Sequence, residues 1–378
     1  MSTLLVGQSG GPTAVINASV MGVINEAKKH VDHVYGLRYG IDGIINEDFI
    51  EISDDISLIP SAYLGSVRFM ITDEYPRILE VFKKYDVRYF IYIGGNDSMD
   101  TCNKIDIYLK SVGYECSVIG VPKTIDNDLV LTHHSPGYGS AAKYIATSFE
   151  ELYLDTHSYK EGRVTIVEVM GRDAGWLTAS SAIARLNGLG PDLIYLPEVT
   201  FDIEKFLSDV DKAYKKNKKV LVAVSEGIKD KGGNYLLKYR TFNNDDAFGH
   251  LQLGGVALVL CEMVNKRLNL PVRAIELNLM QRCAMHIASK TDINEAYNCG
   301  KEAVKACLNK YSGYMVSLND YALKPLKDIA TKVKPFPKEW IINGNSISDE
   351  FYAYVLPLIE GEVSLKFKNG IPFYKTID

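Results

Sequence analysis

Three charged residues that could carry out chemistry, Lys123, Asp126 and Asp128, lie within six positions of one another. They follow the β-branched run Ser117–Val121, which predicts a buried strand. Pro122 should end that strand, because proline has no N–H to donate to the ladder. Ligands bind at the carboxyl ends of strands in open α/β sheets. A carboxylate there can take a proton from a hydroxyl while the lysine faces a phosphate.

Two glycine-rich loops repeat this geometry. Gly7–Pro12 lies between the expected strand Leu4–Val6 and a helix expected from about Thr13 to Lys29, and Gly94–Ser98 follows the strand-like run Arg88–Ile93. Glycine lets backbone N–H groups approach a phosphate, and the helix dipole favours the anion, although a tight turn without a ligand explains the Gly7–Pro12 loop equally well. Neither G-x-G-x-x-G nor G-x-x-x-x-G-K-[ST] occurs, which disfavours dinucleotide-binding and P-loop folds.

Further charged residues stand close to predicted strand ends. Asp97 would repel a phosphate unless it organises Mg²⁺ or a lysine, and the alternative is that it caps the following helix. Glu226 follows an apolar run and could bind sugar hydroxyls or pair with an arginine. Guanidinium groups bind phosphate in a bidentate fork, although any single arginine is more often a solvated surface residue. The arginines concerned are Arg68, Arg163, Arg172, Arg273 and Arg282.

The elements that would position these residues alternate between strands and helices. Apolar runs predict strands at Val164–Val169, Val220–Val224 and Val272–Leu277, and a helix is expected near Leu177–Arg185. Continuous apolar strands separated by helices indicate parallel sheets covered on both faces. The sequence therefore predicts two α/β domains with a cleft between them, and a Lys-, Pro- and Tyr-rich surface extension from about Leu323.

Composition excludes several classes of protein. The chain has 378 residues, 47% of them hydrophobic and 24% charged, with a formal net charge of -5. These values are typical of a globular protein that binds neither nucleic acid nor a membrane. Six cysteines without a C-x-x-C pair are expected to be reduced, and no signal peptide or run of about 20 apolar residues is present. We expect a cytoplasmic protein.

Taken together, the motifs resemble those of the phosphofructokinase family, in the order of that family and from Gly7 to about Leu308. The pieces that carry the resemblance are Ser9–Gly11, Gly65–Arg68, Gly94–Ser98, Pro122–Asp128, Val167–Arg172, Ser225–Gly227, and Arg273 with Gln281–Arg282. The resemblance implies two parallel-sheet, three-layer α/β domains with the active site in the cleft between them. It implies a donor domain of residues 1–137 and about 281–322, a sugar-phosphate domain of about 138–280, and a C-terminal extension of about 323–378.

The resemblance also implies roles for individual residues. Asp126 would be the general base for the 1-hydroxyl of the sugar, with Asp97 and Lys123 as further catalytic residues. Diphosphate would be bound by Gly10 and Arg68. Asn96 stands where the family commonly has an aspartate that contacts Mg²⁺, and its neutral oxygen could still do so. The remaining substrate contacts would be Thr124, Ile125, Asp128, Arg163, Met170, Gly171, Arg172, Glu226, Arg273 and Arg282.

Two positions bear on the phosphoryl donor. Members of the family that use ATP have glycine where this chain has Asp97, and usually where it has Lys123, whereas members that use diphosphate resemble this chain. The resemblance thus implies reversible phosphoryl transfer from diphosphate to fructose 6-phosphate in glycolysis and gluconeogenesis. The alternatives are an ATP-dependent 6-phosphofructokinase, a non-catalytic regulatory subunit and a plain sugar-phosphate-binding module. Family members share Arg163 and Arg273 between subunits, which implies a homodimer or homotetramer.

Overall fold

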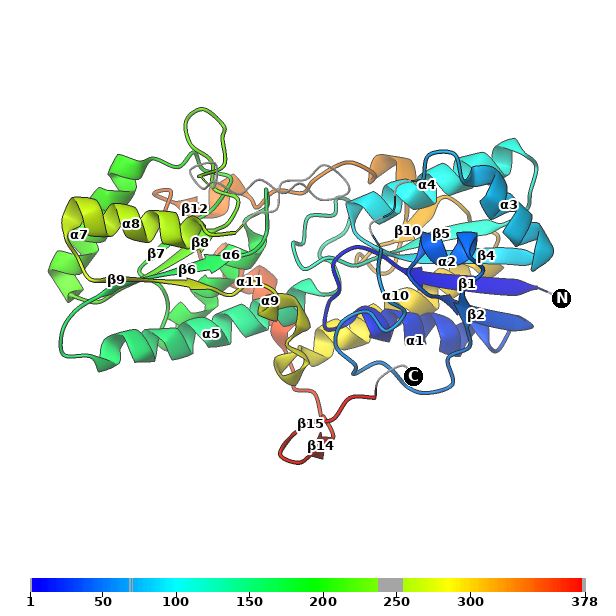
Figure 1. Ribbon diagram of the computed structural model, residues 1–378, viewed down its shortest axis with the longest axis horizontal. Coiled ribbons are helices and arrows are strands. Elements are labelled where there is room, and N and C mark those ends of the chain that lie inside the picture. Colours follow the sequence, from blue (N-terminus) through cyan, green and yellow to red (C-terminus); the bar gives the residue numbers. More distant parts are fainter. Residues whose placement is uncertain (1, 68, 70, 237–253, 376–378) are drawn as a thin grey trace. The chain divides into compact units, whose positions relative to one another are not determined.

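The computed structural model describes residues 2–67, 69, 71–236 and 254–375. Its chain divides into two compact units (Figure 1). Unit 1 comprises residues 1–140, 282–333 and 360–378, and unit 2 comprises residues 141–281 and 334–359. Within the described residues, no helix combines the length and the apolar character needed to cross a bilayer.

Unit 1 is built around one mixed sheet. Its described residues form seven strands in the order β11-β10-β5-β4-β1-β2-β3. The five central strands run parallel, and the two edge strands β11 and β3 are antiparallel to their neighbours. The strands are β1 (Thr3–Gln8), β2 (His33–Leu37), β3 (Phe49–Ile50), β4 (Val87–Gly94), β5 (Ser117–Pro122), β10 (Tyr314–Val316) and β11 (Leu323–Pro325).

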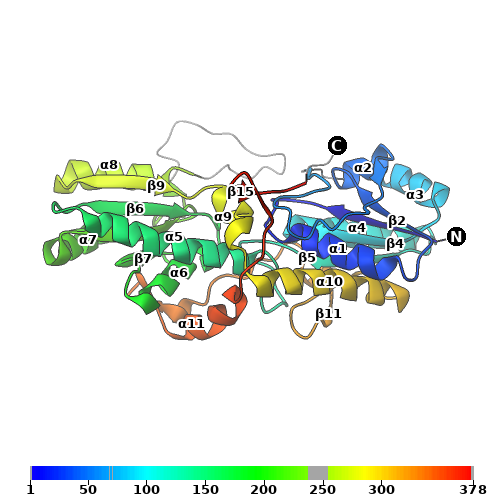
Figure 2. The same ribbon diagram turned by 90° about the horizontal axis from the view of Figure 1, so that it is seen from below.

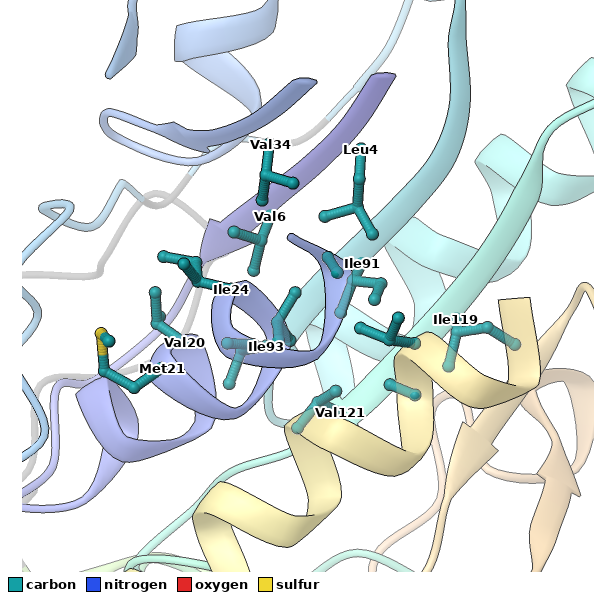
Figure 3. Close-up of a cluster of buried hydrophobic side chains, with 14 of the residues drawn as sticks. Leu4, Val6, Val20, Met21, Ile24, Val34, Ile91, Ile93, Ile119 and Val121 are labelled. Atoms are coloured by element: carbon teal, nitrogen blue, oxygen red, sulfur yellow. The ribbon is translucent and has the colours of Figure 1, made fainter. Parts of the chain in front are cut away.

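Helices cover both faces of this sheet. Alternate side chains of β1 enter different cores: Leu4 and Val6 pack with α1 and α10, whereas Leu5 packs with α2, α3 and α4. Figure 3 shows the first core, where labelled side chains of α1 lie against those of β1, β4 and β5. The helices are α1 (Ile16–Ala27), α2 (Ile41–Ile45), α3 (Tyr75–Lys84), α4 (Asn96–Ser111) and α10 (Lys290–Leu308), with short 3₁₀ turns at Met285–Ile287 and Leu326–Asp328.

Two glycines let α1 and α10 approach closely. A Cβ atom on Gly22 of α1 would lie 1.9 Å from the carbonyl oxygen of Tyr297 in α10, and one on Gly300 would lie 2.1 Å from the carbonyl oxygen of Ser19. Real Cβ atoms do not approach backbone so closely, so each helix has glycine where the other crosses it. This crossing fixes α10 beneath the strands that lead into the glycine-rich loops and the Lys123–Asp128 segment, which are together called the donor loops below.

Unit 2 contains a smaller sheet. In its described part, four parallel strands stand in the order β7-β8-β6-β9, namely β6 (Val164–Val169), β7 (Leu193–Tyr195), β8 (Val220–Ser225) and β9 (Val272–Glu276). Apolar residues of β6 and β8 pack with α7 (Ile203–Asn217) and α8 (Val256–Leu268) on one face. Figure 2 shows α5 (Tyr138–Ser158) on the other side of β6 from α8.

Several short elements complete unit 2. They are α6 (Trp176–Ser180), the 3₁₀ helix Ser181–Asn187, 3₁₀ turns at Lys338–Trp340 and Leu356–Ile359, the strand pair β12 (Ile341–Ile342) and β13 (Ser346–Ile347), and α11 (Glu350–Val355). The chain passes from unit 2 back to unit 1 within the short helix α9 (Met280–Cys283). The predicted fold class is confirmed, because both units have helices on each face of a largely parallel sheet.

The predicted elements differ from the observed ones mainly at their ends. The helix expected from Thr13 to Lys29 is α1, which begins only at Ile16, and the helix expected near Leu177–Arg185 is split into α6 and a 3₁₀ helix. Pro122 is the last residue of β5, as predicted.

The prediction of a surface extension from about Leu323 is wrong for most of that segment. β11 joins the edge of the unit 1 sheet, and the side chains of Phe336 and Phe351 are fully buried within unit 2. The most exposed large apolar side chains of this segment are Phe367 and Ile371, in the strand pair β14 (Phe367–Lys368) and β15 (Ile371–Pro372). Aromatic residues in the tail therefore signal packing and not a solvated extension.

Candidate active site

Three neighbouring strand ends in unit 1 bring the predicted donor loops together. β4 lies between β1 and β5 in the sheet, with Gln8 paired to Ile93 and Gly94 paired to Pro122. Backbone hydrogen bonds continue the pairing past the strand ends, from Ser9 N to Ile93 O and from Lys123 N to Gly94 O, both at 2.9 Å. The glycine loops and the Lys123–Asp128 segment therefore emerge side by side from the same edge of the sheet.

The first glycine loop accommodates the lysine of the third loop. Lys123 Nζ donates a hydrogen bond to Gly11 O at 2.6 Å, and Ser66 Oγ donates one to Gly10 O at 2.6 Å. Gly10 has a φ of +75°, and a Cβ atom on it would lie 3.2 Å from the ammonium nitrogen. A side chain at position 10 would thus be strained and would crowd the cation. Glycine at this position lets the backbone fold closely around a buried positive charge.

Lys123 is an unusually buried lysine, with only 3% of its surface exposed. Burial, together with the nearby Arg282 guanidinium, lowers the pKa of its ammonium group from 10.5 to about 8. Asp126 and Asp128 act in the opposite direction and hold the pKa up. The lysine is therefore still mostly protonated at neutral pH. An anion beside it would be attracted strongly, because water screens this buried positive charge poorly.

Arg282 lies near the donor loops. Its Nη1 atom would be 3.0 Å from a Cβ atom on Gly11, and its charge acts on Lys123. The resemblance implies that this residue binds the 6-phosphate of the sugar. Two cations thus converge on the loop that is best shaped for phosphate.

The second glycine loop begins helix α4. Gly95 is the N-cap residue, and no side chain caps the helix. Asp97 is an exposed residue of the first turn, so the alternative prediction that Asp97 caps α4 is wrong. Asn96 Nδ2 donates a hydrogen bond to Asp128 Oδ2 at 3.0 Å. Asn96 Oδ1 is buried and accepts no hydrogen bond from the residues that the structure describes.

The Thr124–Asp128 loop is held by its own backbone. Asp126 N donates to Thr124 Oγ1 at 3.1 Å, and the buried Ile125 anchors the turn. Asn127 has a φ of +55° and accepts a hydrogen bond from Ser135 N at 3.1 Å. The sequence reasoning missed Asn127, although asparagine between two aspartates is a recognisable signal for a left-handed backbone position. The result is a rigid turn that leaves the carboxylates of Asp126 and Asp128 half-buried.

A second cluster of predicted residues lies at the carboxyl ends of β6 and β8 in unit 2. Glu226 Oε1 accepts hydrogen bonds from Gly171 N and Arg172 N, both at 3.3 Å, and Gln281 Oε1 accepts one from Met170 N at 3.2 Å. Gly171 and Arg172 have φ values of +134° and +47°. The carboxylate of Glu226 therefore holds an unusual turn at Met170–Arg172.

Two of the predicted arginines lie at the other end of the unit 2 sheet. Arg163 immediately precedes β6, with its guanidinium 4.1 Å from the centre of the Tyr159 ring, and Arg273 is the second residue of β9. Because β6 has six residues, these arginines lie about 20 Å from Met170 along the strand. One copy of the chain does not bring them to the Met170–Arg172 turn. Arg68, the remaining predicted arginine, lies outside the described residues.

Comparisons with known proteins agree with this arrangement. The phosphofructokinase family model matches residues 3–307. A pyrophosphate–fructose 6-phosphate 1-phosphotransferase of Halomonas elongata is 40% identical, over 97% of this chain and 93% of its own, and one of Methylococcus capsulatus is 37% identical, over 98% and 94%. A crystal structure of a pyrophosphate-dependent phosphofructokinase from Nitrosospira multiformis has a TM-score of 0.88 and 38% identity, covering 99% of this chain and 95% of that one. This chain belongs to the phosphofructokinase family.

Proposed function

We propose that this protein transfers a phosphoryl group from diphosphate to the 1-hydroxyl of fructose 6-phosphate. The products are fructose 1,6-bisphosphate and phosphate. The donor assignment depends on the presence of two residues. Asp97 lies in the first turn of α4, and the buried Lys123 lies beside Gly10. The names of the relatives support the same reaction for this chain.

In this proposal unit 1 binds the donor. Gly10 and Arg68 contact diphosphate, and the ammonium group of Lys123 stabilises charge on the phosphoryl group as it moves. Asp126 takes the proton from the sugar hydroxyl, for which its half-buried carboxylate at the end of a rigid turn is suited. Because donor and product are both simple phosphate compounds, we expect appreciable reverse flux.

Asp97 explains why diphosphate and not ATP is the donor. Its carboxylate adds negative charge where the α-phosphate of a nucleotide would lie. Two like charges about 4 Å apart repel by about 4 kcal/mol at an effective dielectric of about 20. Diphosphate lacks the nucleoside and the third phosphate, so it avoids this repulsion. The ATP-dependent alternative is therefore disfavoured by both charge and bulk.

The proposal includes Mg²⁺, and the residues fit that ion. Asn96 Oδ1 is a buried amide oxygen without a hydrogen-bond donor among the described residues, and Asn96 holds the Asp128 carboxylate at 3.0 Å. Hard cations prefer such oxygen ligands, and Mg²⁺ usually takes only one or two from the protein and others from phosphate and water. No cluster of three or more histidine, cysteine or acidic residues suited to a metal occurs in the described part. The bound ion would neutralise charge on the phosphates.

Unit 2 binds the sugar phosphate in this proposal. Met170, Gly171, Arg172 and Glu226 form its pocket, with Thr124, Ile125 and Asp128 as further contacts. Arg163, Arg273 and Arg282 bind the 6-phosphate. Because Arg163 and Arg273 lie about 20 Å from Met170 along β6, we propose that they serve the site of a second copy, in a cytoplasmic homodimer or homotetramer.

A donor assay tests the proposal directly. The purified protein is given fructose 6-phosphate and Mg²⁺ with either diphosphate or ATP, and release of fructose 1,6-bisphosphate is measured. We expect turnover with diphosphate and at most about one hundredth of that rate with ATP. The repulsion of about 4 kcal/mol between Asp97 and a nucleotide phosphate is more than enough for this difference, because each 1.4 kcal/mol corresponds to a factor of about ten in rate. Equal or faster turnover with ATP would overturn the donor assignment.

A variant tests the assigned base. Asp126→Ala should lower kcat by at least about 100-fold while the Kd for fructose 6-phosphate, measured by calorimetry, stays within about threefold. Asp100→Ala is the matched control, because Asp100 is a carboxylate of α4 that is ion-paired with Lys104 at 2.6 Å. Near-normal turnover of Asp126→Ala would remove Asp126 from this role.

A further inference from the structure

A fully buried carboxylate in unit 1 has no part in the mechanism so far. Asp292 belongs to the first turn of α10 and is 1% exposed. Its Oδ1 accepts a hydrogen bond from Gly137 N at 2.9 Å, and its Oδ2 accepts one from Ser140 N at 2.8 Å. Both donors lie at the start of α5, where backbone N–H groups have no partner within the helix. Asp292 thus fastens the segment that leads into α5 onto α10.

That segment also supports the loop that carries Asp126. Gly137 pairs with Thr124 in a parallel bridge, and Thr124 N donates a hydrogen bond to Pro136 O at 3.1 Å. Thr124 Oγ1 in turn accepts the hydrogen bond from Asp126 N. A short chain of contacts therefore runs from Asp292 through Gly137 and Thr124 to the backbone of Asp126.

Burying this carboxylate costs free energy, so its presence at this position needs a specific reason. Burial, together with the nearby Glu295, raises the pKa of the Asp292 carboxyl to about 6. Hydrogen bonds from Ser140 and Gly137 act against this rise and favour the ionised form. An asparagine would offer one acceptor atom, and its NH₂ group would face the other backbone N–H. The carboxylate is thus the group that satisfies both N–H groups at once.

We propose that Asp292 is a positioning residue for Asp126: by holding Gly137 and Ser140, it keeps the Pro136–Gly137 segment against Thr124 and so fixes the turn that carries the base. This inference rests on the proposed function, in which Asp126 takes the proton from the sugar hydroxyl. Misplacing a catalytic group by about 1 Å can cost about 100-fold in rate, so loss of this support should affect turnover more than binding.

The test compares Asp292→Asn with Asp106→Asn. Asp106 is also buried in unit 1, where its Oδ1 accepts a hydrogen bond from Ser312 Oγ at 2.5 Å and its Oδ2 accepts one from Lys110 Nζ at 2.7 Å. It lies ten residues into α4, about 15 Å along the helix from Asn96. Both variants lose a buried carboxylate, so both should be less stable, but only Asp292→Asn should loosen the loop.

Steady-state kinetics and hydrogen exchange provide separate readouts. For Asp292→Asn we expect kcat to fall at least about tenfold with the KM for each substrate within about threefold, and amide exchange in residues 123–128 to rise at least about tenfold. For Asp106→Asn both quantities should match the parent protein. Unchanged exchange in residues 123–128, or an equal fall in kcat in both variants, would overturn the inference. A parent protein without diphosphate turnover would instead refute the proposed function, while the exchange comparison would still decide whether Asp292 supports the loop.

Discussion

Replacing Lys123 by methionine should make the protein more stable and less active. The fall in the pKa of Lys123 from 10.5 to about 8 corresponds to about 3 kcal/mol of destabilisation by a buried charge, at about 1.4 kcal/mol for each pKa unit. Methionine has a similar shape and no charge to desolvate. The variant loses the hydrogen bond from Nζ to Gly11 O, which is worth about 1–2 kcal/mol. We therefore expect Lys123→Met to gain about 1–2 kcal/mol in the free energy of unfolding at pH 7.

The pH dependence of that gain follows from the direction of the pKa change. Below pH 8 both the folded and the unfolded chain hold the proton on Lys123, so the full cost of the buried charge is present. Between pH 8 and 10.5 the folded chain releases the proton first, and its stability rises relative to the variant. Since this rise is about 1.4 kcal/mol for each pH unit, the advantage of Lys123→Met should disappear near pH 9, and the parent protein should be the more stable of the two by pH 10.5, in urea unfolding followed at each pH.

Lys123→Met should lower activity although it raises stability. The kcat/KM for diphosphate of the parent protein should fall as pH rises above about 8, by up to tenfold for each pH unit, because only the ammonium form attracts the anion. Lys123→Met should lose at least about 100-fold in kcat/KM at pH 7 and lack this decline. Lys104→Met is the control, since Lys104 is half-exposed and paired with Asp100. A destabilised Lys123→Met, or one with parental kcat/KM for diphosphate, would refute the reasoning.

Three further predictions concern the donor, the helix crossing and the second copy. Asp97→Gly combined with Lys123→Gly should raise kcat/KM for ATP at least about tenfold, and an ATP assay without any gain would contradict the charge and bulk argument. Gly22→Ala should lower the free energy of unfolding by about 2 kcal/mol or more in urea titrations, because its Cβ would meet the Tyr297 carbonyl at 1.9 Å; an unchanged midpoint would show that α1 and α10 separate easily. Arg163→Ala should raise the KM for fructose 6-phosphate about tenfold or more and leave that for diphosphate within about twofold, whereas a rise for diphosphate alone would place Arg163 on the donor side.

The strand ends and their loops were predictable because their signals are local. Glycine next to an apolar run, and proline at the end of one, determine the backbone at those positions whatever surrounds them, so the ends of β1, β4 and β5 follow from the sequence. Short strands were missed for the converse reason. β7 and β10 have three residues each, too few for a period to emerge, and they form only because neighbouring strands pair with them.

Side-chain positions that depend on tertiary contacts could not be predicted from the sequence. Arg163 precedes β6 and Arg172 follows it, so chain order alone puts Arg163 at the amino end of the strand, away from the carboxyl end where ligands bind. Which other residues surround each arginine depends on tertiary contacts and does not follow from chain order. Asp292 could have been noticed, because Ser289 and Asp292 form the pattern of a capping box and Ser289 Oγ accepts a hydrogen bond from Asp292 N at 3.3 Å. Its role in holding α5 could not, since its partners Gly137 and Ser140 are about 150 positions away.

The charges around the second glycine loop explain why asparagine suits position 96. Its amide holds Asp128 at 3.0 Å, and Asp97 lies next to it in the chain. A carboxylate at position 96 would face that of Asp128 at hydrogen-bond distance, and two carboxylates so close cannot both ionise at neutral pH without a cation. Asparagine supplies an oxygen to a metal without this conflict, while leaving one buried acceptor unsatisfied at a cost of about 1–3 kcal/mol. A cation that arrives with diphosphate would satisfy that acceptor, so the loop favours a donor that brings its own metal.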